Sequence, residues 1–138
     1  HFAHLAHAEV IAGQAVGQLV IDLFRHEGHE GMQEREQLMS HLLRLGPKGR
    51  YSRFSATLND AMVAAYVIQT FSASNFYVGF FDQDILRGVV EIHDMGPNGQ
   101  SAELAFSIEL GWRGQGVGAR LFAAAVAAAL ARGYAAAQ

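Results

Sequence analysis

The sequence contains no cysteine, only two prolines and few charged residues. Without cysteine the chain forms no disulfide, no thiolate zinc site, no iron–sulfur cluster and no thiol nucleophile. Charged residues make up 17%, against about 25% in average soluble domains, and 10 Lys and Arg stand against 13 Asp and Glu, a net charge of −3. Because neutralising phosphates takes a basic surplus, we expect no nucleic-acid partner.

Long hydrophobic runs are also missing. The most apolar run, Leu121 to Leu130, is about half of the roughly 20 residues that a bilayer crossing needs, and Arg120 and Arg132 bracket it closely. No cationic stretch follows His1, so the sequence shows no secretory signal. We therefore expect a cytoplasmic protein with no membrane partner.

What the sequence does have is a high apolar fraction, 51% of its 138 residues. That is enough for a sizeable core, and the length suits one domain, so residues 1–138 are taken as a single domain. Leu38, Leu42 and Leu45 recur at helical spacing. They predict an amphipathic helix over Gln33–Leu45, after a polar loop at His26–Gly31.

The segment 46–49, with its two glycines and one proline, is expected to end this helix. Ser55 or Thr57 is the expected N-cap of a second helix that runs to Thr70. A strand is expected further upstream, over Gln18–Phe24. Two helices are therefore expected before the main part of the sheet.

From Phe76 onward the apolar period changes to that of strands. Strands are predicted over Phe76–Phe81 and Ile85–His93, with a turn at Asp82–Asp84 and a loop at Asp94–Gly99. Ser101–Leu110 alternates most cleanly and is the fourth predicted strand. Its apolar face carries Leu104, Phe106, Ile108 and Leu110, and its other face carries Glu103, Ala105, Ser107 and Glu109.

A glycine-rich segment follows this strand. Gly111, Gly114, Gly116 and Gly118 precede or begin an alanine-rich helix that is predicted over Val117–Arg132. Glycines allow backbone N–H groups to approach and point at an anion, and a helix N-terminus adds unsatisfied donors. The segment therefore predicts a loop that binds phosphate or pyrophosphate, with a glycine-rich turn that binds nothing as the alternative.

Three phosphate-binding patterns compete for this loop. A Walker loop needs Lys where Val117 stands. A dinucleotide fingerprint needs an acidic residue on a second strand about 20 positions further on, where the sequence ends. The third pattern, Arg/Gln-x-x-Gly-x-Gly/Ala, is present as Arg113-Gly114-Gln115-Gly116-Val117-Gly118.

With this hexad, and with helices, a strand meander and the strand Ala102–Ile108 ahead of it, the chain resembles the GNAT superfamily of acetyl-CoA-dependent N-acetyltransferases. The resemblance implies an α/β fold whose mixed, mostly antiparallel sheet is flanked by helices, with the phosphate-binding loop after the fourth strand. It also implies acetyl-CoA as co-substrate. The implied residues are Phe106, Ser107, Ile108, Glu109 and Leu110 for the pantetheine arm and Arg113, Gly114, Gln115, Gly116, Val117 and Gly118 for the pyrophosphate.

The sequence differs from the family pattern at its C-terminal end. A typical member continues with a further strand, a helix that often carries a general-acid Tyr, and a final strand pair, whereas this sequence ends at Gln138. Tyr134 is expected to begin the further strand and is not the equivalent of that general acid.

Transfer of an acetyl group to an amine requires a group that takes a proton from the ammonium. The resemblance implies Glu103, on the polar face of the fourth strand, as this general base. A hairpin centred near Pro97 would place Glu91 opposite Glu103, with His93 close by on the same face. Two facing carboxylates would raise the pKa of one of them and attract a cationic amine. The alternative is that both glutamates are solvated residues of the sheet face.

Histidines near the N-terminus suggest a second hypothesis. His1, His4 and His7 share helical spacing, and His26 and His29 adjoin glutamates, so a metal site can be drawn from them. A polar helix face explains the same pattern, and we expect no metal. A similar choice applies to Trp112, where an anchor between loop and sheet is favoured over stacking on the cofactor.

The function expected from these observations is the direct transfer of an acetyl group from acetyl-CoA to a primary amine of a small molecule or a protein. The absence of cysteine is consistent with transfer that has no acyl-enzyme. The alternative is a non-catalytic module with the same fold that binds acyl-CoA or a protein partner. Under that alternative, a homodimer would complete the exposed edge of the final strand.

Overall fold

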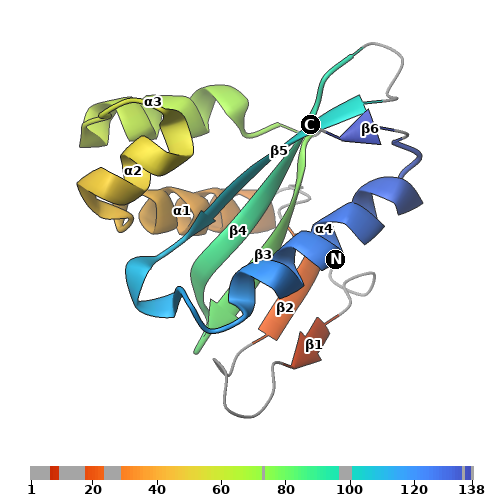
Figure 1. The fold of residues 1–138 in the computed structure, drawn as a ribbon. Coiled ribbons are helices and arrows are strands. Elements are labelled where there is room, and N and C mark those ends of the chain that lie inside the picture. Colours follow the sequence, from red (N-terminus) through yellow and green to blue (C-terminus); the bar gives the residue numbers. More distant parts are fainter. Residues whose placement is uncertain are drawn as a thin grey trace.

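A computed structural model of the chain describes residues 7–9, 18–23, 29–72, 74–96, 101–134 and 136–137. One twisted sheet forms the centre of the molecule (Figure 1). Helices α1, α2 and α3 lie on one face of the sheet, and α4 lies on the other. The mixed α/β architecture predicted from the sequence is confirmed. No helix among the described residues is long and apolar enough to cross a membrane.

The sheet has six strands whose spatial order is the order of the chain. The strands are β1 (His7–Glu9), β2 (Gln18–Leu23), β3 (Phe76–Asp82), β4 (Ile85–Asp94), β5 (Ser101–Ile108) and β6 (Ala136–Ala137). Every pairing from β1 to β5 is antiparallel, and β6 pairs in parallel with β5 at Ser101 and Ala102. From Glu103 onward, the outer edge of β5 has no strand beside it among the described residues.

The strand predictions agree with the structure to within one or two residues, with one addition. Strand β1 was not expected, so the fourth predicted strand is β5 in the structure. Strand β5 ends at Ile108 because the next residues form a short 3-10 turn, Leu110–Trp112. The segment 97–100, which includes the second half of the expected loop at Asp94–Gly99, lies outside the described residues.

Three helices, rather than two, cover the first face of the sheet. Helix α1 spans His29–Leu43, so it begins inside the segment that was expected to be a polar loop. Helix α2 spans Gly46–Phe54 and was not expected. Its proline lies in the first helical turn, where no N–H is needed and the fixed backbone angle of proline favours the helix. The residues interpreted as a stop are therefore the start of a further helix.

Helix α3 spans Asp60–Thr70, and its N-cap differs from both expected candidates. Asn59 caps it, because its side-chain Oδ1 accepts a hydrogen bond of 2.9 Å from the backbone N–H of Met62. Ser55 instead ends α2 in a left-handed conformation.

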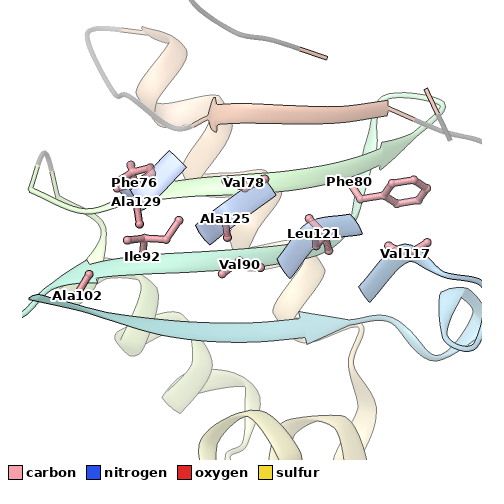
Figure 2. Close-up of a cluster of buried hydrophobic side chains, with 10 residues drawn as sticks. All are labelled: Phe76, Val78, Phe80, Val90, Ile92, Ala102, Val117, Leu121, Ala125 and Ala129. Carbon is pink, nitrogen blue, oxygen red and sulfur yellow. The ribbon is translucent and has the colours of Figure 1, made fainter. Parts of the chain in front are cut away.

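Two hydrophobic clusters hold these layers together. Figure 2 shows the cluster between α4 (Val117–Ala131) and the sheet. It contains Phe76, Val78, Phe80, Val90, Ile92, Ala102, Val117, Leu121, Ala125 and Ala129. The small alanines of α4 let the helix axis approach the strands closely. The second cluster joins α1 and α3 to the opposite face of β3 and β4 through Leu38, Leu42, Leu45, Val63, Val67, Tyr77, Leu86 and Val89.

Candidate functional site

A cavity of about 500 Å³ lies where α2 and α3 meet the end of β4 and the middle of β5. Its lining consists of Ser52, Arg53, Tyr66, Thr70, His93, Glu103, Leu104, Ala105 and Phe106. The cavity therefore adjoins the stretch of β5 whose outer edge has no strand partner among the described residues. Its volume is in the range of ordinary small-molecule sites.

The pairing of β4 with β5 differs from the expected register. Glu103 lies opposite His93, and Glu91 lies opposite Ala105, so the two glutamates do not face each other. The hairpin is centred one residue later than expected, which moves every pair by two positions and keeps both glutamates on the same face of the sheet. The two glutamates are therefore diagonal neighbours in very different surroundings.

Glu91 is fully buried and its carboxylate is held by three side chains. Arg53 binds both oxygens, with Nε donating to Oε2 at 3.1 Å and one terminal nitrogen donating to Oε1 at 2.9 Å. The hydroxyl of Tyr66 donates to Oε1, and Nε2 of His93 lies 3.1 Å from the same oxygen. Arg53 also donates to the oxygen of Tyr66, so the four side chains form one network.

The network shifts the pKa values of Glu91 and Tyr66. Burial alone raises the pKa of the Glu91 carboxyl, but the hydrogen bond from His93 and the charge and hydrogen bonds of Arg53 outweigh burial and lower this pKa to about 2. Burial and the Glu91 charge raise the pKa of the Tyr66 hydroxyl. Glu91 is therefore a carboxylate, and Tyr66 a neutral hydroxyl, across the physiological range.

Acid is expected to destabilise the chain through Glu91. The pKa of Glu91 in the folded chain is lower than its ordinary value of 4.5. The ionised carboxylate therefore stabilises the folded chain above pH 4.5, and this stabilisation is lost as the pH falls through about 2. The difference corresponds to about 3 kcal/mol in the free energy of unfolding. Urea denaturation at steps from pH 7 to pH 2 measures it, with Glu91→Gln as the control that should lose this part of the pH dependence. An unchanged pH dependence in Glu91→Gln would contradict the assignment.

Glu103 contrasts with Glu91. Its side chain is exposed and lines the cavity, and no hydrogen bond or ion pair is described for it within the part of the chain whose side chains are placed. Because Arg53 and Glu91 neutralise each other, Glu103 is the carboxylate in the cavity lining that remains available to a bound cation.

The glycine-rich loop lies between β5 and α4, as predicted. Gly114 and Gly116 have positive φ angles of 74° and 85°, which glycine adopts without strain. Helix α4 begins at Val117, has no side-chain cap at Gly116 and carries no acidic residue in its first turn. Nε of Arg113 donates to the carbonyl of Ile108 at 3.0 Å and ties the loop back to β5. No acidic side chain in the first turn of α4 therefore competes with a bound anion for the backbone N–H groups of that turn.

The residues expected along the pantetheine arm divide between two environments. Phe106 and Leu110 are exposed, and Ile108 is half-buried beside α4. Ser107, on the opposite face of β5, and Glu109, just after the end of this strand, are buried. Trp112 packs against Phe80, with ring centroids 6.0 Å apart, which agrees with its expected role as an anchor of the loop.

Arg53 and Tyr66 were not predicted as parts of the site. Both come from helices, 38 and 25 positions before Glu91 in the chain. The histidines considered for a metal have side chains outside the described part of the chain. Among the residues whose side chains are described, no group of three or more His, Asp or Glu could hold a metal ion.

Comparison with known proteins identifies the fold. No protein-family model matches the sequence, and no curated protein matches it either. Among solved structures, the GNAT domain of S. lividans PAT has a TM-score of 0.71 and 20% identity, covering 96% of this chain and 76% of that chain. An aminoglycoside 6'-N-acetyltransferase from Enterococcus faecium has a TM-score of 0.57 and 23% identity, covering 79% of this chain and 55% of that chain.

A third structure is the PaiA N-acetyltransferase from Thermoplasma acidophilum in complex with coenzyme A. It has a TM-score of 0.51 and 14% identity, covering 74% of this chain and 69% of that chain. These proteins share little sequence with the chain, and the similarity lies in the fold. The chain therefore has the fold of the GNAT N-acetyltransferases.

Proposed function

We propose that the chain transfers the acetyl group of acetyl-CoA directly to a primary amine that binds in the cavity beside β5. The observation that carries this proposal is the position of Glu103, a carboxylate with no described partner, in a cavity that adjoins the outer edge of β5, beside which the described part of the chain places no strand from Glu103 onward. The glycine-rich loop follows the same strand. The similarity to GNAT structures, one of which contains coenzyme A, supports the same assignment.

Backbone groups of the chain suit the binding of acetyl-CoA. The outer edge of β5 offers N–H and C=O groups to the pantetheine arm, which carries amides of its own. The loop from Arg113 to Gly118 and the first turn of α4 offer N–H donors to the pyrophosphate. Bound in this way, acetyl-CoA supplies the activated acyl group, with its thioester near the cavity.

In the proposed reaction, Glu103 first binds the ammonium of the acceptor and takes a proton from it. The free amine attacks the thioester carbonyl, the new C–N bond forms, and the C–S bond breaks. The nitrogen, which becomes positively charged when it attacks, gives up a second proton; the leaving sulfur takes a proton in turn and departs as the thiol of CoA, so that two protons leave the nitrogen, one to Glu103 and one to the sulfur. Leu104, Ala105 and Phe106 contribute apolar side chains to the lining of the same cavity.

Glu91 was expected to assist as a second catalytic residue, and this role stays a prediction. Its burial, its two hydrogen bonds to Arg53 and its lowered pKa favour a different task, which is to hold His93 and Tyr66 in place. His93 faces the cavity from the position opposite Glu103. The acceptor therefore meets one available carboxylate beside a network of hydrogen-bonded side chains.

The experiment that tests the proposal has two stages. Isothermal titration first measures the affinity for CoA and acetyl-CoA, and the absence of binding up to millimolar concentration would reject the proposal. Release of CoA thiol is then followed with a panel of small amines and lysine peptides. Binding without turnover on any acceptor would identify the chain as the non-catalytic acyl-CoA-binding module instead.

Gly116→Val is expected to weaken the binding of acetyl-CoA by at least about tenfold. A β-branched side chain is strained at a φ angle of 85° and would block the approach of the pyrophosphate to the loop. Gly111→Ala is the matched control, because a Cβ at Gly111 meets no atom within 4 Å and the φ angle there is not positive. Titration calorimetry compares the two variants. Equal affinities in both would show that the loop does not hold the pyrophosphate.

A further inference from the structure

A second buried cluster of charged residues lies at the end of β5, away from the cavity. The Glu109 carboxylate is in contact with three basic side chains, two from the end of α1 and the residue that follows it, and one from β4. Nδ1 of His41, on α1, lies 3.0 Å from Oε2, and Nε of Arg44, which directly follows α1, donates to the same oxygen at 2.9 Å. From β4, Arg87 donates to Oε1 at 2.8 Å. His41 is fully buried and Glu109 is 6% exposed, so solvent does not replace these contacts.

The cluster adjoins the glycine-rich loop directly. The backbone N–H of Glu109 donates to the carbonyl of Arg87, and the N–H of Trp112 donates to the carbonyl of Glu109, both at 2.9 Å. The Arg87 guanidinium also lies over the Trp112 ring, 5.8 Å from its centroid. The chain of contacts therefore runs from α1 through Glu109 and Arg87 to Trp112 and the start of the loop.

The cluster also contains a serine hydroxyl in contact with histidine. Oγ of Ser107 lies 2.9 Å from Nε2 of His41, whose other nitrogen meets Glu109. The order serine, histidine, carboxylate is the one found in catalytic triads, where the histidine activates a nucleophilic serine. Ser107 is buried, however, and does not line the cavity, while Arg44 and Arg87 compete with His41 for the carboxylate. The contacts therefore fit a fixed structural junction better than a nucleophile.

We propose that Glu109 is a positioning residue for the loop that binds the pyrophosphate of acetyl-CoA. The inference rests on the proposed function, because it assumes that this loop holds the cofactor. Glu109 fixes the end of β5 against α1 and holds Arg87 in place, and Arg87 in turn holds Trp112. The backbone donors of the following residues are thereby kept in the arrangement that the anion requires.

The direction in which Glu109→Gln changes the affinity for CoA distinguishes a positioning role of Glu109 from a purely electrostatic one. Glu109→Gln removes one negative charge close to a loop that would hold a pyrophosphate. Coulomb interactions alone then predict tighter binding of CoA, because repulsion is removed. Loss of positioning predicts weaker binding, because Gln cannot accept charge-assisted hydrogen bonds from three basic side chains. We expect the dissociation constant for CoA to rise about tenfold or more.

Asp60→Asn is the matched control. It also replaces a carboxylate that pairs with an arginine, since Asp60 lies 2.7 Å from Arg50, but this pair joins α2 to α3 and has no described contact with the loop. Its dissociation constant for CoA should stay within about twofold of the wild type. Arg87→Lys is the second test variant. It keeps the charge but gives up the planar contact with Trp112, so electrostatics predicts no change and positioning predicts weaker binding.

Trp112 is the only tryptophan of the sequence, so its fluorescence reports on the loop itself. We expect Glu109→Gln and Arg87→Lys to shift its emission in the free protein, and Asp60→Asn to leave it unchanged. Calorimetric titration with CoA, run below the melting temperature of each variant, gives the affinities. If the wild type binds no CoA, the proposed function and the positioning role both fail. If it binds CoA and both test variants bind equally well or more tightly, the positioning role alone is overturned.

Discussion

Arg53→Met is expected to lower the free energy of unfolding by about 3–5 kcal/mol, the usual cost of removing one partner from a buried ion pair. Glu91 is fully buried, and Arg53 supplies two of its hydrogen bonds and its compensating positive charge. Arg53 also lies over the rings of Phe54 and Tyr66, at 4.5 and 5.2 Å from their centroids. Urea denaturation at pH 7, followed by circular dichroism, measures the loss.

The double variant Arg53→Met with Glu91→Gln is the control for this experiment. It removes the uncompensated charge, so it should be more stable than Arg53→Met alone, by an amount that a double-mutant cycle reports as coupling between the two residues. A loss of less than about 1 kcal/mol in Arg53→Met, or additive effects in the cycle, would show that the pair is not coupled as the structure indicates.

Glu103→Gln is expected to slow the chemical step by about 10²- to 10⁴-fold, with little change in affinity for acetyl-CoA. Glutamine keeps the shape of the side chain but does not accept the proton of the ammonium. The measurement is the turnover rate at saturating acetyl-CoA across pH 6 to 9, with the best acceptor from the amine panel. Slow hydrolysis of acetyl-CoA serves as the assay if no acceptor is found.

Glu36→Gln is the matched control, because Glu36 is an exposed glutamate on α1 that does not line the cavity beside β5. Its turnover should equal that of the wild type. A Glu103→Gln variant that keeps more than about half of the wild-type rate would remove Glu103 from the role of base. Transfer through His93 or a chain of waters would then be the next hypothesis to test.

The strands were largely predictable, and the helices less so. Alternation along Ser101–Ile108 is a local property, and it places β5 and the loop after it almost correctly. The segment at Pro47 was misinterpreted because the same residue types end one helix and begin another. Helix α1 begins before the first leucine of its apolar pattern. This start was not predicted, because the first turns of the helix carry few apolar residues. The general fold follows from the order of elements, while the helix boundaries depend on tertiary packing.

The candidate site was predictable only in the part that adjoins the loop. Glu103 could be found because it lies on the polar face of β5 itself. Its expected partner was misplaced, because moving the centre of one hairpin by a single residue puts His93 rather than Glu91 opposite it. Arg53 and Tyr66 could not be found, because the helices that bring them to Glu91 meet it only in the folded chain. The sequence pattern therefore could not predict that Arg53 neutralises Glu91 next to the cavity.

The strand order has a consequence for the way the chain folds. Strands β1 to β5 lie in the sheet in the order in which they occur in the sequence, so each pairs with the strand before it. The hairpins β3–β4 and β4–β5 need only short loops, and short-range contacts of this kind form fast. Strand β6 is different, because a parallel partner of β5 requires the whole of α4 as a crossover. Because closing this longer connection costs more chain entropy than closing a hairpin loop, we expect the β5–β6 pairing to form after the β3–β4 and β4–β5 hairpins.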